Sequence, residues 1–172
     1  MNKTAKTVLI ILIAIVCVGC DQVTKSLARE QLESRPPMIL FDDLVRIHYS
    51  ENTGAMLGLG ANLPPNLRFW LLSVVAGLML VGMLVFAWRS DSLDFFGILG
   101  IGLLVGGGVS NLIDRVISGR VIDFMNIGIG NLRTGIFNVA DVAIMLGAGL
   151  IIVWSIRSRD SGGQADQSAH QD

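Results

Sequence analysis

Two aspartates set in apolar sequence are the strongest candidates for chemistry in this chain. Asp123 lies in the segment VIDFM, and Asp141 lies in VADVAI, eighteen positions further on. An ionised carboxylate is costly to bury unless it is paired, hydrogen bonded or protonated. We therefore expect both carboxyl groups to have specific partners. The working hypothesis is that they meet at the edge of a membrane and act together.

The inventory of other side chains narrows the chemistry to carboxylates. The chain has only two histidines, His48 and His170, which disfavours a Ser/His/Asp triad. The chain contains no HExxH motif and no cysteine pair with metal-binding spacing, so the sequence does not indicate a metal site. Two neighbouring aspartates cannot both ionise easily, so one keeps a proton while the other can activate water. This is the chemistry of an aspartic peptidase, and it needs no metal and no cofactor.

Further candidate residues lie on helical faces beside apolar runs. Asn111, Asp114 and Arg115 recur at i, i+3 and i+4 at the end of one such run, so they share a face. A surface pair between Asp114 and Arg115 is the simpler alternative. Asp21 precedes Lys25 by four positions, which is the favourable order for an ion pair on one helix. A simple helix-end salt bridge is the alternative there.

Two candidates also have a purely local interpretation. Asn52-Thr53-Gly54 is typical of a turn, here between a strand predicted over Leu40–Tyr49 and a returning strand over Leu57–Leu59. Asn138 suits a helix N-cap, with Asp141 three positions later satisfying free amides and the helix dipole. Spacing alone leaves capping and catalysis open for Asp141.

Composition indicates a membrane protein. Of the 172 residues, 52% are hydrophobic, 16% are charged and 20 are glycine, and the mean hydropathy is +0.62. Soluble proteins carry about 25% charged residues, and glycine suits close helix packing in membranes. The net charge of −1 gives no reason to expect nucleic acid as a partner.

Uncharged runs predict four transmembrane helices within a single domain over residues 1–156. The predicted spans cover about residues 7–25, 69–88, 95–113 and 139–156. The first uncharged run, Thr7–Cys20, also resembles a cleavable signal segment, and Cys20 ends an approximate lipobox. We favour retention of this run as a helix, because the later spans indicate a polytopic protein. Residues 157–172 are polar and are predicted to be a disordered cytoplasmic tail.

The four spans place both termini on one side of the membrane. The basic N-terminal arm and the tight Arg89–Asp94 turn favour the cytoplasmic side. The segment Ile117–Ile136, which contains Asp123, is expected to lie on the membrane surface or to close over the site. A small transporter that uses the aspartates for protons or cations is the competing hypothesis. The acids lie at span ends and no inverted repeat is visible, which favours the peptidase.

Five segments in order resemble the lipoprotein signal peptidases, or type II signal peptidases, over roughly residues 7–156. They are Asp21-Gln22-Val23-Thr24-Lys25, Asn52-Thr53-Gly54-Ala55, Asn111-Leu112-Ile113-Asp114-Arg115, Val121-Ile122-Asp123-Phe124 and Phe137-Asn138-Val139-Ala140-Asp141. The chain departs from the family pattern at Met56-Leu57, where Ala-Phe is common, and at Ser110, where Gly is common.

The resemblance implies an α-helical membrane protein: four transmembrane helices, a small extracytoplasmic β-cradle and a periplasmic loop or helix. It implies an aspartic endopeptidase of the bacterial inner membrane that removes signal peptides from prolipoproteins, cutting before the diacylglyceryl-modified lipobox cysteine. Both termini would be cytoplasmic, with the site near the outer leaflet. The implied partners are prolipoproteins and membrane lipid, globomycin is the implied inhibitor, and the implied state is a monomer.

The resemblance also implies a role for each motif residue. Asp123 and Asp141 would be the catalytic pair. The residues that support them or bind substrate would be Asn52, Gly54, Asn111, Arg115, Asn138 and Ala140. Asp21, Lys25 and Asp114 would brace the first helix.

Overall fold

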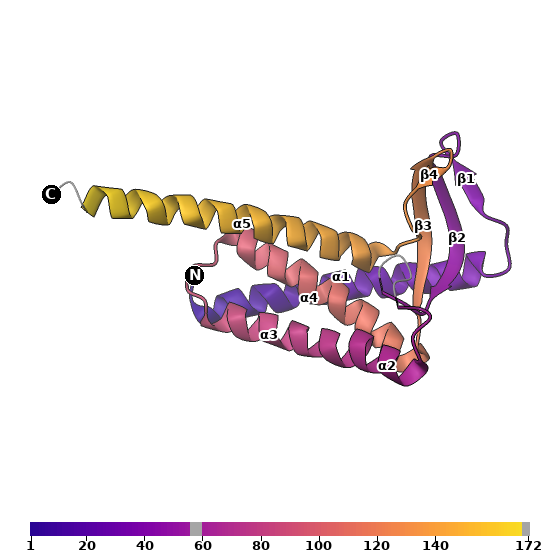
Figure 1. Ribbon diagram of the computed structural model, residues 1–172, viewed down its shortest axis with the longest axis horizontal. Coiled ribbons are helices and arrows are strands. Elements are labelled where there is room, and N and C mark those ends of the chain that lie inside the picture. Colours follow the sequence, from indigo (N-terminus) through magenta and orange to yellow (C-terminus); the bar gives the residue numbers. More distant parts are fainter. Residues whose placement is uncertain (56–59, 170–172) are drawn as a thin grey trace.

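Four helical rods and one small sheet make up the structure, a computed structural model that describes residues 1–55 and 60–169. The rods lie side by side, and the sheet stands across one end of them (Figure 1). The N-terminus and the C-terminal end of the last helix (Val139–Ala169) lie at the opposite end (Figure 1). The predicted fold class, a membrane helix bundle with a small antiparallel sheet, is confirmed.

All four predicted spans fall within helical segments. These are α1 (Lys3–Leu32), a second rod that joins α2 (Pro65–Phe69), the π-helical η2 (Trp70–Val75) and α3 (Ala76–Arg89), then α4 (Phe95–Ser118) and α5 (Val139–Ala169). Each rod is long and apolar enough to cross a membrane. The uncharged run Thr7–Cys20 lies inside α1, which continues well past it.

One part of the predicted tail is helical instead of disordered. The helix α5 continues to Ala169, so residues 157–169 extend the fourth rod. The segment contains no proline, so every backbone N–H can continue the ladder begun in the membrane span. Residues 170–172, which include His170, lie outside the described residues.

The sheet contains four antiparallel strands in the order β1 (Met38–Leu40), β2 (Val45–Asn52), β3 (Val121–Ile129) and β4 (Leu132–Arg133). The strand predicted over Leu40–Tyr49 is divided between β1 and β2. A tight turn separates them, in which Phe41, Asp42 and Asp43 all have positive φ. The predicted returning strand over Leu57–Leu59 lies outside the described residues, as does the Met56-Leu57 departure.

The segment Ile117–Ile136 is not a surface loop or helix, because most of it is strand. Gly119 ends α4 in the left-handed conformation, with φ of 71°, and β3 begins two residues later. The strand pairs with β2 so that Asp123 lies opposite Ser50 and Val121 lies opposite Asn52. The pairing satisfies backbone groups that a loop would leave open. Asp123 therefore sits on a rigid element.

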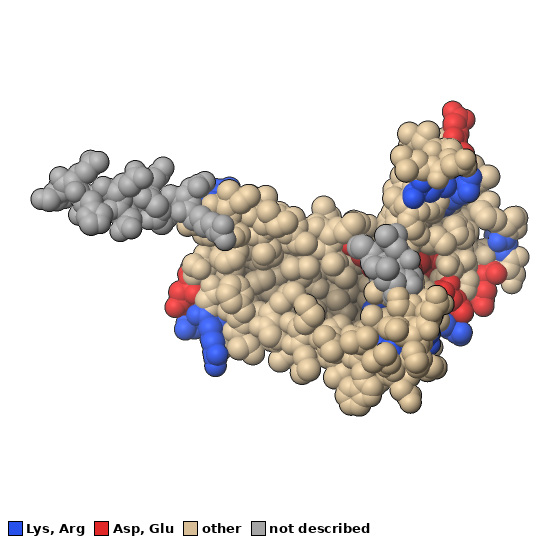
Figure 2. Space-filling model, in the orientation of Figure 1, with Lys and Arg blue, Asp and Glu red and all other residues tan. Residues whose placement is uncertain are grey.

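The middle of the bundle is apolar and the charges lie toward its two ends. Ile10, Ile98, Ile101 and Val105 form the buried core between the helices. Leucine, isoleucine and valine side chains are exposed along the outer faces of the rods. Charged side chains gather at the end with the N-terminus and around the sheet, with an apolar belt between them (Figure 2). Lipid is the solvent that suits such a belt.

The helix α4 lies against both α1 and α5, and small residues permit this packing. A Cβ atom added at Gly107 of α4 would lie 2.5 Å from the carbonyl oxygen of Ala140 in α5. Such a contact is too short for any side chain, so Gly107 sets how closely the first turn of α5 approaches α4. The same turn carries Asp141.

We predict that Gly107→Ala destabilises the protein by about 1–3 kcal/mol, because the added methyl group forces the helices apart. Gly149→Ala is the matched control on α5, where no atom lies within 4 Å of the added Cβ. Tryptophan fluorescence during thermal unfolding in detergent measures both variants. Equal melting temperatures for the two would contradict a close-packed contact at Gly107.

Candidate functional site

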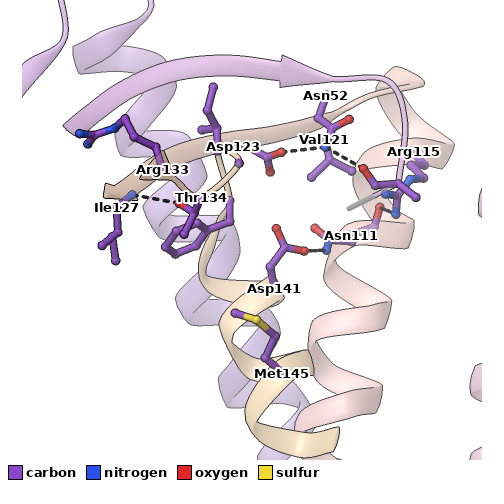
Figure 3. A pocket seen from close by; sticks show the side chains of 14 residues that line it. Asn52, Asn111, Arg115, Val121, Asp123, Ile127, Arg133, Thr134, Asp141 and Met145 are labelled. Carbon is purple, nitrogen blue, oxygen red and sulfur yellow. Dashed lines mark hydrogen bonds between the residues drawn. The ribbon is translucent and has the colours of Figure 1, made fainter. Parts of the chain in front are cut away.

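A cavity of about 510 Å³ lies where the sheet meets the ends of α4 and α5. Asp123 reaches it from β3, Asp141 from the first turn of α5, and Asn111 and Arg115 from α4. The two carboxyl groups point toward the same space (Figure 3). Apolar side chains form much of the remaining wall: Val121, Ile127, Ile136, Phe137 and Met145. The two aspartates of the sequence analysis therefore line one cavity.

Asp123 is almost fully buried and accepts one amide hydrogen bond on each carboxylate oxygen. Its Oδ2 accepts from Nδ2 of Asn52 at 2.9 Å, and its Oδ1 accepts from Nδ2 of Asn138 at 2.6 Å. Burial, together with the charge of the neighbouring Asp141, raises the pKa of Asp123 from 3.8 to about 6. The hydrogen bonds from Asn52 and Asn138 oppose this rise by stabilising the ionised form.

Asp141 is both a helix cap and a site residue, so the two interpretations of its position are compatible. Its Oδ2 accepts from the backbone N–H of Asn138 at 3.2 Å, while Oδ1 of Asn138 accepts from the backbone N–H of Asp141 at 2.9 Å. This reciprocal pair is the geometry of a capping box. The other oxygen, Oδ1, accepts from Nδ2 of Asn111 at 2.9 Å and faces the cavity.

Asn138 connects the two aspartates. It is fully buried, and its side chain contacts Asp123 while its backbone and Oδ1 contact Asp141. Its Nδ2 also lies 3.2 Å from Oδ1 of Asn111 and 3.3 Å from the carbonyl oxygen of Ile122. One amide therefore sets the spacing of β3, α4 and α5 around the cavity.

The predicted brace joins three helices. The ammonium group of Lys25 lies 2.6 Å from Oδ2 of Asp21 on its own helix and 2.7 Å from Oδ2 of Asp114 on α4. Asp21 in turn accepts from the backbone N–H of Ala140 on α5 at 2.8 Å. The interpretation of Asp21 and Lys25 as a simple helix-end pair is therefore incomplete. All of these groups are buried or nearly so.

The alternative of a surface pair between Asp114 and Arg115 is wrong. Asp114 pairs with Lys25 and accepts from the amide of Gln22 at 3.0 Å. Arg115 turns the other way, and its Nη2 donates to the carbonyl oxygen of Gly54 at 3.1 Å. The residues are adjacent in sequence, so their side chains leave α4 about 100° apart.

The Asn52 turn belongs to the site as well. Asn52 Oδ1 accepts from the backbone N–H of Gly54 at 2.9 Å, which leaves its Nδ2 directed at Asp123. Together with the contact from Arg115, this holds the turn against α4 at the rim of the cavity (Figure 3). The local interpretation of Asn52 as a turn residue is correct, since its side chain also donates to the carbonyl oxygen of Ala55, but it leaves out the hydrogen bond to Asp123.

Three contributors were missed by sequence reasoning. Ser110, noted only as a departure from the family pattern, is fully buried and donates to Asp21 Oδ2 at 2.7 Å. Gln22 donates to Oγ of Ser110 at 2.9 Å. Arg133 of β4 lines the cavity and donates to the carbonyl oxygen of Asp43 at 2.8 Å. Neighbouring sequence carries no signal for these contacts, since each partner is distant along the chain.

Comparison with known proteins matches residues 13–157 to the family described as signal peptidase (SPase) II. The chain belongs to the signal peptidase II family. It is therefore a peptidase, and its four apolar helices fit a multi-pass bacterial membrane protein. The resemblance stated from the five sequence segments is confirmed. Among residues 1–55 and 60–158, no group of three or more His, Cys, Asp or Glu side chains could hold a metal ion.

Relatives and solved structures agree with this assignment. A lipoprotein signal peptidase of Chlorobium phaeobacteroides strain BS1 is 33% identical over 155 residues, which cover 85% of this chain and 94% of the relative. One from Symbiobacterium thermophilum is 33% identical over 143 residues, covering 83% and 91%. Two solved structures of bacterial membrane enzymes, each 29% identical, superpose with TM-scores of 0.76 and 0.70. They cover 88% and 84% of this chain, and 90% of their own chains.

The raised pKa of Asp123 predicts a pH dependence of stability. The folded chain holds this proton up to about pH 6, whereas an unfolded aspartate loses it near 3.8. The folded state therefore binds more protons between these values, and its stability falls as the pH rises through them. One pKa unit corresponds to about 1.4 kcal/mol, so the loss is about 3 kcal/mol at most.

Asp123→Asn should remove this contribution. We expect the melting temperature of the parent to fall more steeply than that of the variant between about pH 4 and pH 6. Thermal unfolding in detergent at closely spaced pH values measures the difference. Parallel curves for the two proteins would show that Asp123 titrates normally in the folded state.

Proposed function

We propose that this signal peptidase II is an aspartic endopeptidase in which Asp123 and Asp141 form the catalytic pair. The observation that carries the proposal is that two carboxyl groups from separate elements face one cavity and are both hydrogen bonded to Asn138. Within the described part of the chain, neither aspartate forms an ion pair with lysine or arginine at salt-bridge distance, so both carboxyl groups remain available for proton transfer. Structural carboxylates such as Asp21 and Asp114 instead pair with Lys25.

The proposed reaction follows from how two close carboxyl groups share one proton. The ionised carboxylate accepts a proton from a water molecule, whose oxygen then attacks the carbonyl carbon of the scissile peptide bond. The protonated carboxyl group donates to the carbonyl oxygen as the tetrahedral intermediate forms. Collapse of the intermediate breaks the C–N bond. The departing amine takes up the proton that the first carboxylate received from water, while a hydroxyl group of the intermediate returns a proton to the second carboxylate. Both groups then return to their starting states.

The substrates in this proposal are prolipoproteins, cut before a cysteine that carries a diacylglyceryl group. The cavity offers polar groups at the aspartates and an apolar wall elsewhere, which suits a peptide bond next to a lipid-modified side chain. Arg115 and Asn52 lie at the rim, where they can hold the peptide backbone, and Gly54 and Ala140 keep the adjoining backbone close. Every one of these residues belongs to a single chain, so we propose that a monomer is sufficient.

The orientation in the membrane follows from the same geometry. The basic arm with Lys3 and Lys6 lies at the end of the bundle opposite the sheet (Figure 1). Positive segments of membrane proteins favour the cytoplasmic side. We therefore propose that both termini are cytoplasmic and that the site lies near the outer leaflet of the inner membrane, where lipid can reach it. Globomycin, as an inhibitor, would occupy the cavity.

We predict that Asp123→Asn and Asp141→Asn each lower the rate of cleavage of a diacylated lipobox peptide by at least about 10²–10⁴-fold. Loss of one general acid or base removes a contribution of this size. Cleavage by the purified protein in detergent micelles, followed by mass spectrometry of the products, measures the effect.

Asp91→Asn is the control for these variants, because Asp91 is exposed and lies at the opposite end of the bundle beside Lys3. It should cleave at the parent rate. If a folded Asp123→Asn or Asp141→Asn protein also cleaved at that rate, the assignment of the catalytic pair would be wrong. A parent protein that transports cations but leaves the peptide intact would favour the competing transporter hypothesis.

A further inference from the structure

The side chain of Asn111 has two different ends, and the structure uses each for a different neighbour. Its Nδ2 donates to Oδ1 of Asp141 at 2.9 Å. Its Oδ1 accepts from the ammonium group of Lys25 at 2.9 Å and from Nδ2 of Asn138 at 3.2 Å. Rotating the amide by 180° would place oxygen against the Asp141 carboxylate and nitrogen against an ammonium group. Both contacts would then be repulsive.

Lys25 is the group that forbids this rotation. An ammonium group can donate three hydrogen bonds and can accept none. The three N–H groups of Lys25 are directed at Asp21, Asp114 and Asn111. Lys25 is 2% exposed, so water cannot substitute for one of these partners. Asn138 also donates to Oδ1 of Asn111, but the same Nδ2 group makes a shorter contact, of 2.6 Å, to Asp123.

We propose that Lys25 is a positioning residue for the catalytic pair: through Asn111 it keeps a hydrogen-bond donor on Asp141, so that Asp141 is the ionised base and the shared proton rests on Asp123. The inference rests on the proposed function for its catalytic meaning. What it states about the structure is the orientation of the Asn111 amide and the location of one proton on Asp123. The role goes beyond bracing, since a brace needs only the ion pairs with Asp21 and Asp114.

The surroundings of Asp141 stabilise a negative charge more strongly than those of Asp123, which favours the same location of the proton. Asp141 lies in the first turn of α5, where free N–H groups and the helix dipole stabilise an anion, and its donor Asn111 is itself polarised by a cation. Asp123 lies on a strand, and the two hydrogen bonds that it receives from described side chains come from the neutral amides of Asn52 and Asn138. The charged groups of the neighbouring elements are Asp21 and Lys25 on α1, Asp114 and Arg115 on α4, Asp123 on β3 and Arg133 on β4.

The test removes the ammonium group without changing the charge of its cluster. Lys25 with Asp21 and Asp114 carries a net charge of +1 − 2 = −1, and Lys25→Met/Asp114→Asn carries the same −1. The single variant Asp114→Asn is the matched control, because it keeps the contact between Lys25 and Asn111. Lys25→Met/Asp21→Asn is a second charge-matched variant, should the first not fold.

Cleavage of the diacylated peptide is then measured as a function of pH. We expect the acidic limb of the kcat profile to move up by about one pH unit in the double variants, with kcat reduced about tenfold below the limb, because Asp141 loses a charge-assisted donor. KM should change less than about threefold, since the substrate contacts remain. In Asp114→Asn the cluster becomes neutral and the contact between Lys25 and Asn111 remains, so the midpoint should not move up. Equal midpoints in the parent and a folded double variant would overturn the proposal.

A second measurement needs neither cleavage nor a Lys25 variant. The infrared band of protonated carboxyl groups is titrated in the parent, in Asp123→Asn and in Asp141→Asn. We expect the band at mildly acidic pH to persist in Asp141→Asn and to disappear in Asp123→Asn. The reverse assignment would overturn the inference. If the parent failed to cleave the peptide but gave this infrared pattern, the proposed function alone would be wrong.

Discussion

The buried ammonium group of Lys25 is the interaction on which the rest of the bundle depends. It pairs with carboxylates from α1 and α4, and one of them, Asp21, also holds the first turn of α5 through the backbone of Ala140. Removing one partner from a buried pair costs about 3–5 kcal/mol, because the other charge is left without compensation. Three helices are therefore locked at the level of the cavity. Apolar packing alone specifies position less strictly inside a membrane, where lipid competes equally for apolar surface.

Next to this cluster, three asparagines hold the two site aspartates in place by donating hydrogen bonds to them. Each has its side-chain oxygen occupied by a donor: Asn52 by the backbone of Gly54, Asn111 by Lys25, and Asn138 by the backbone of Asp141. Each amide nitrogen is consequently directed at a carboxylate. A neutral donor can stabilise a carboxylate without pairing with it as a cation would, so the aspartates remain free to exchange a proton.

The sheet contributes the remaining constraint, because it presents Asp123 to the membrane helices. A carboxyl group on a loop could retreat into water, but a residue in the middle of β3 cannot move without breaking the ladder with β2. Burial then raises the pKa of Asp123 to about 6, near the pH at which a shared proton can move.

Local sequence was sufficient to predict the four spans and the polar helix face that contains Asn111 and Asp114, because hydropathy and helical spacing are properties of neighbouring residues. It also singled out Asp123 and Asp141 as candidate site residues, because each lies among apolar neighbours. It could not determine that Ile117–Ile136 pairs with β2, since the two strands lie about seventy positions apart and pairing is decided by long-range contacts. Sharing of Lys25 between two carboxylates, burial of Ser110 beside Asp21 and the close approach at Gly107 were likewise decided only by the tertiary structure. Each depends on how α1, α4 and α5 pack. That packing directs the two aspartates, one cap-like and one in a strand, into a single cavity.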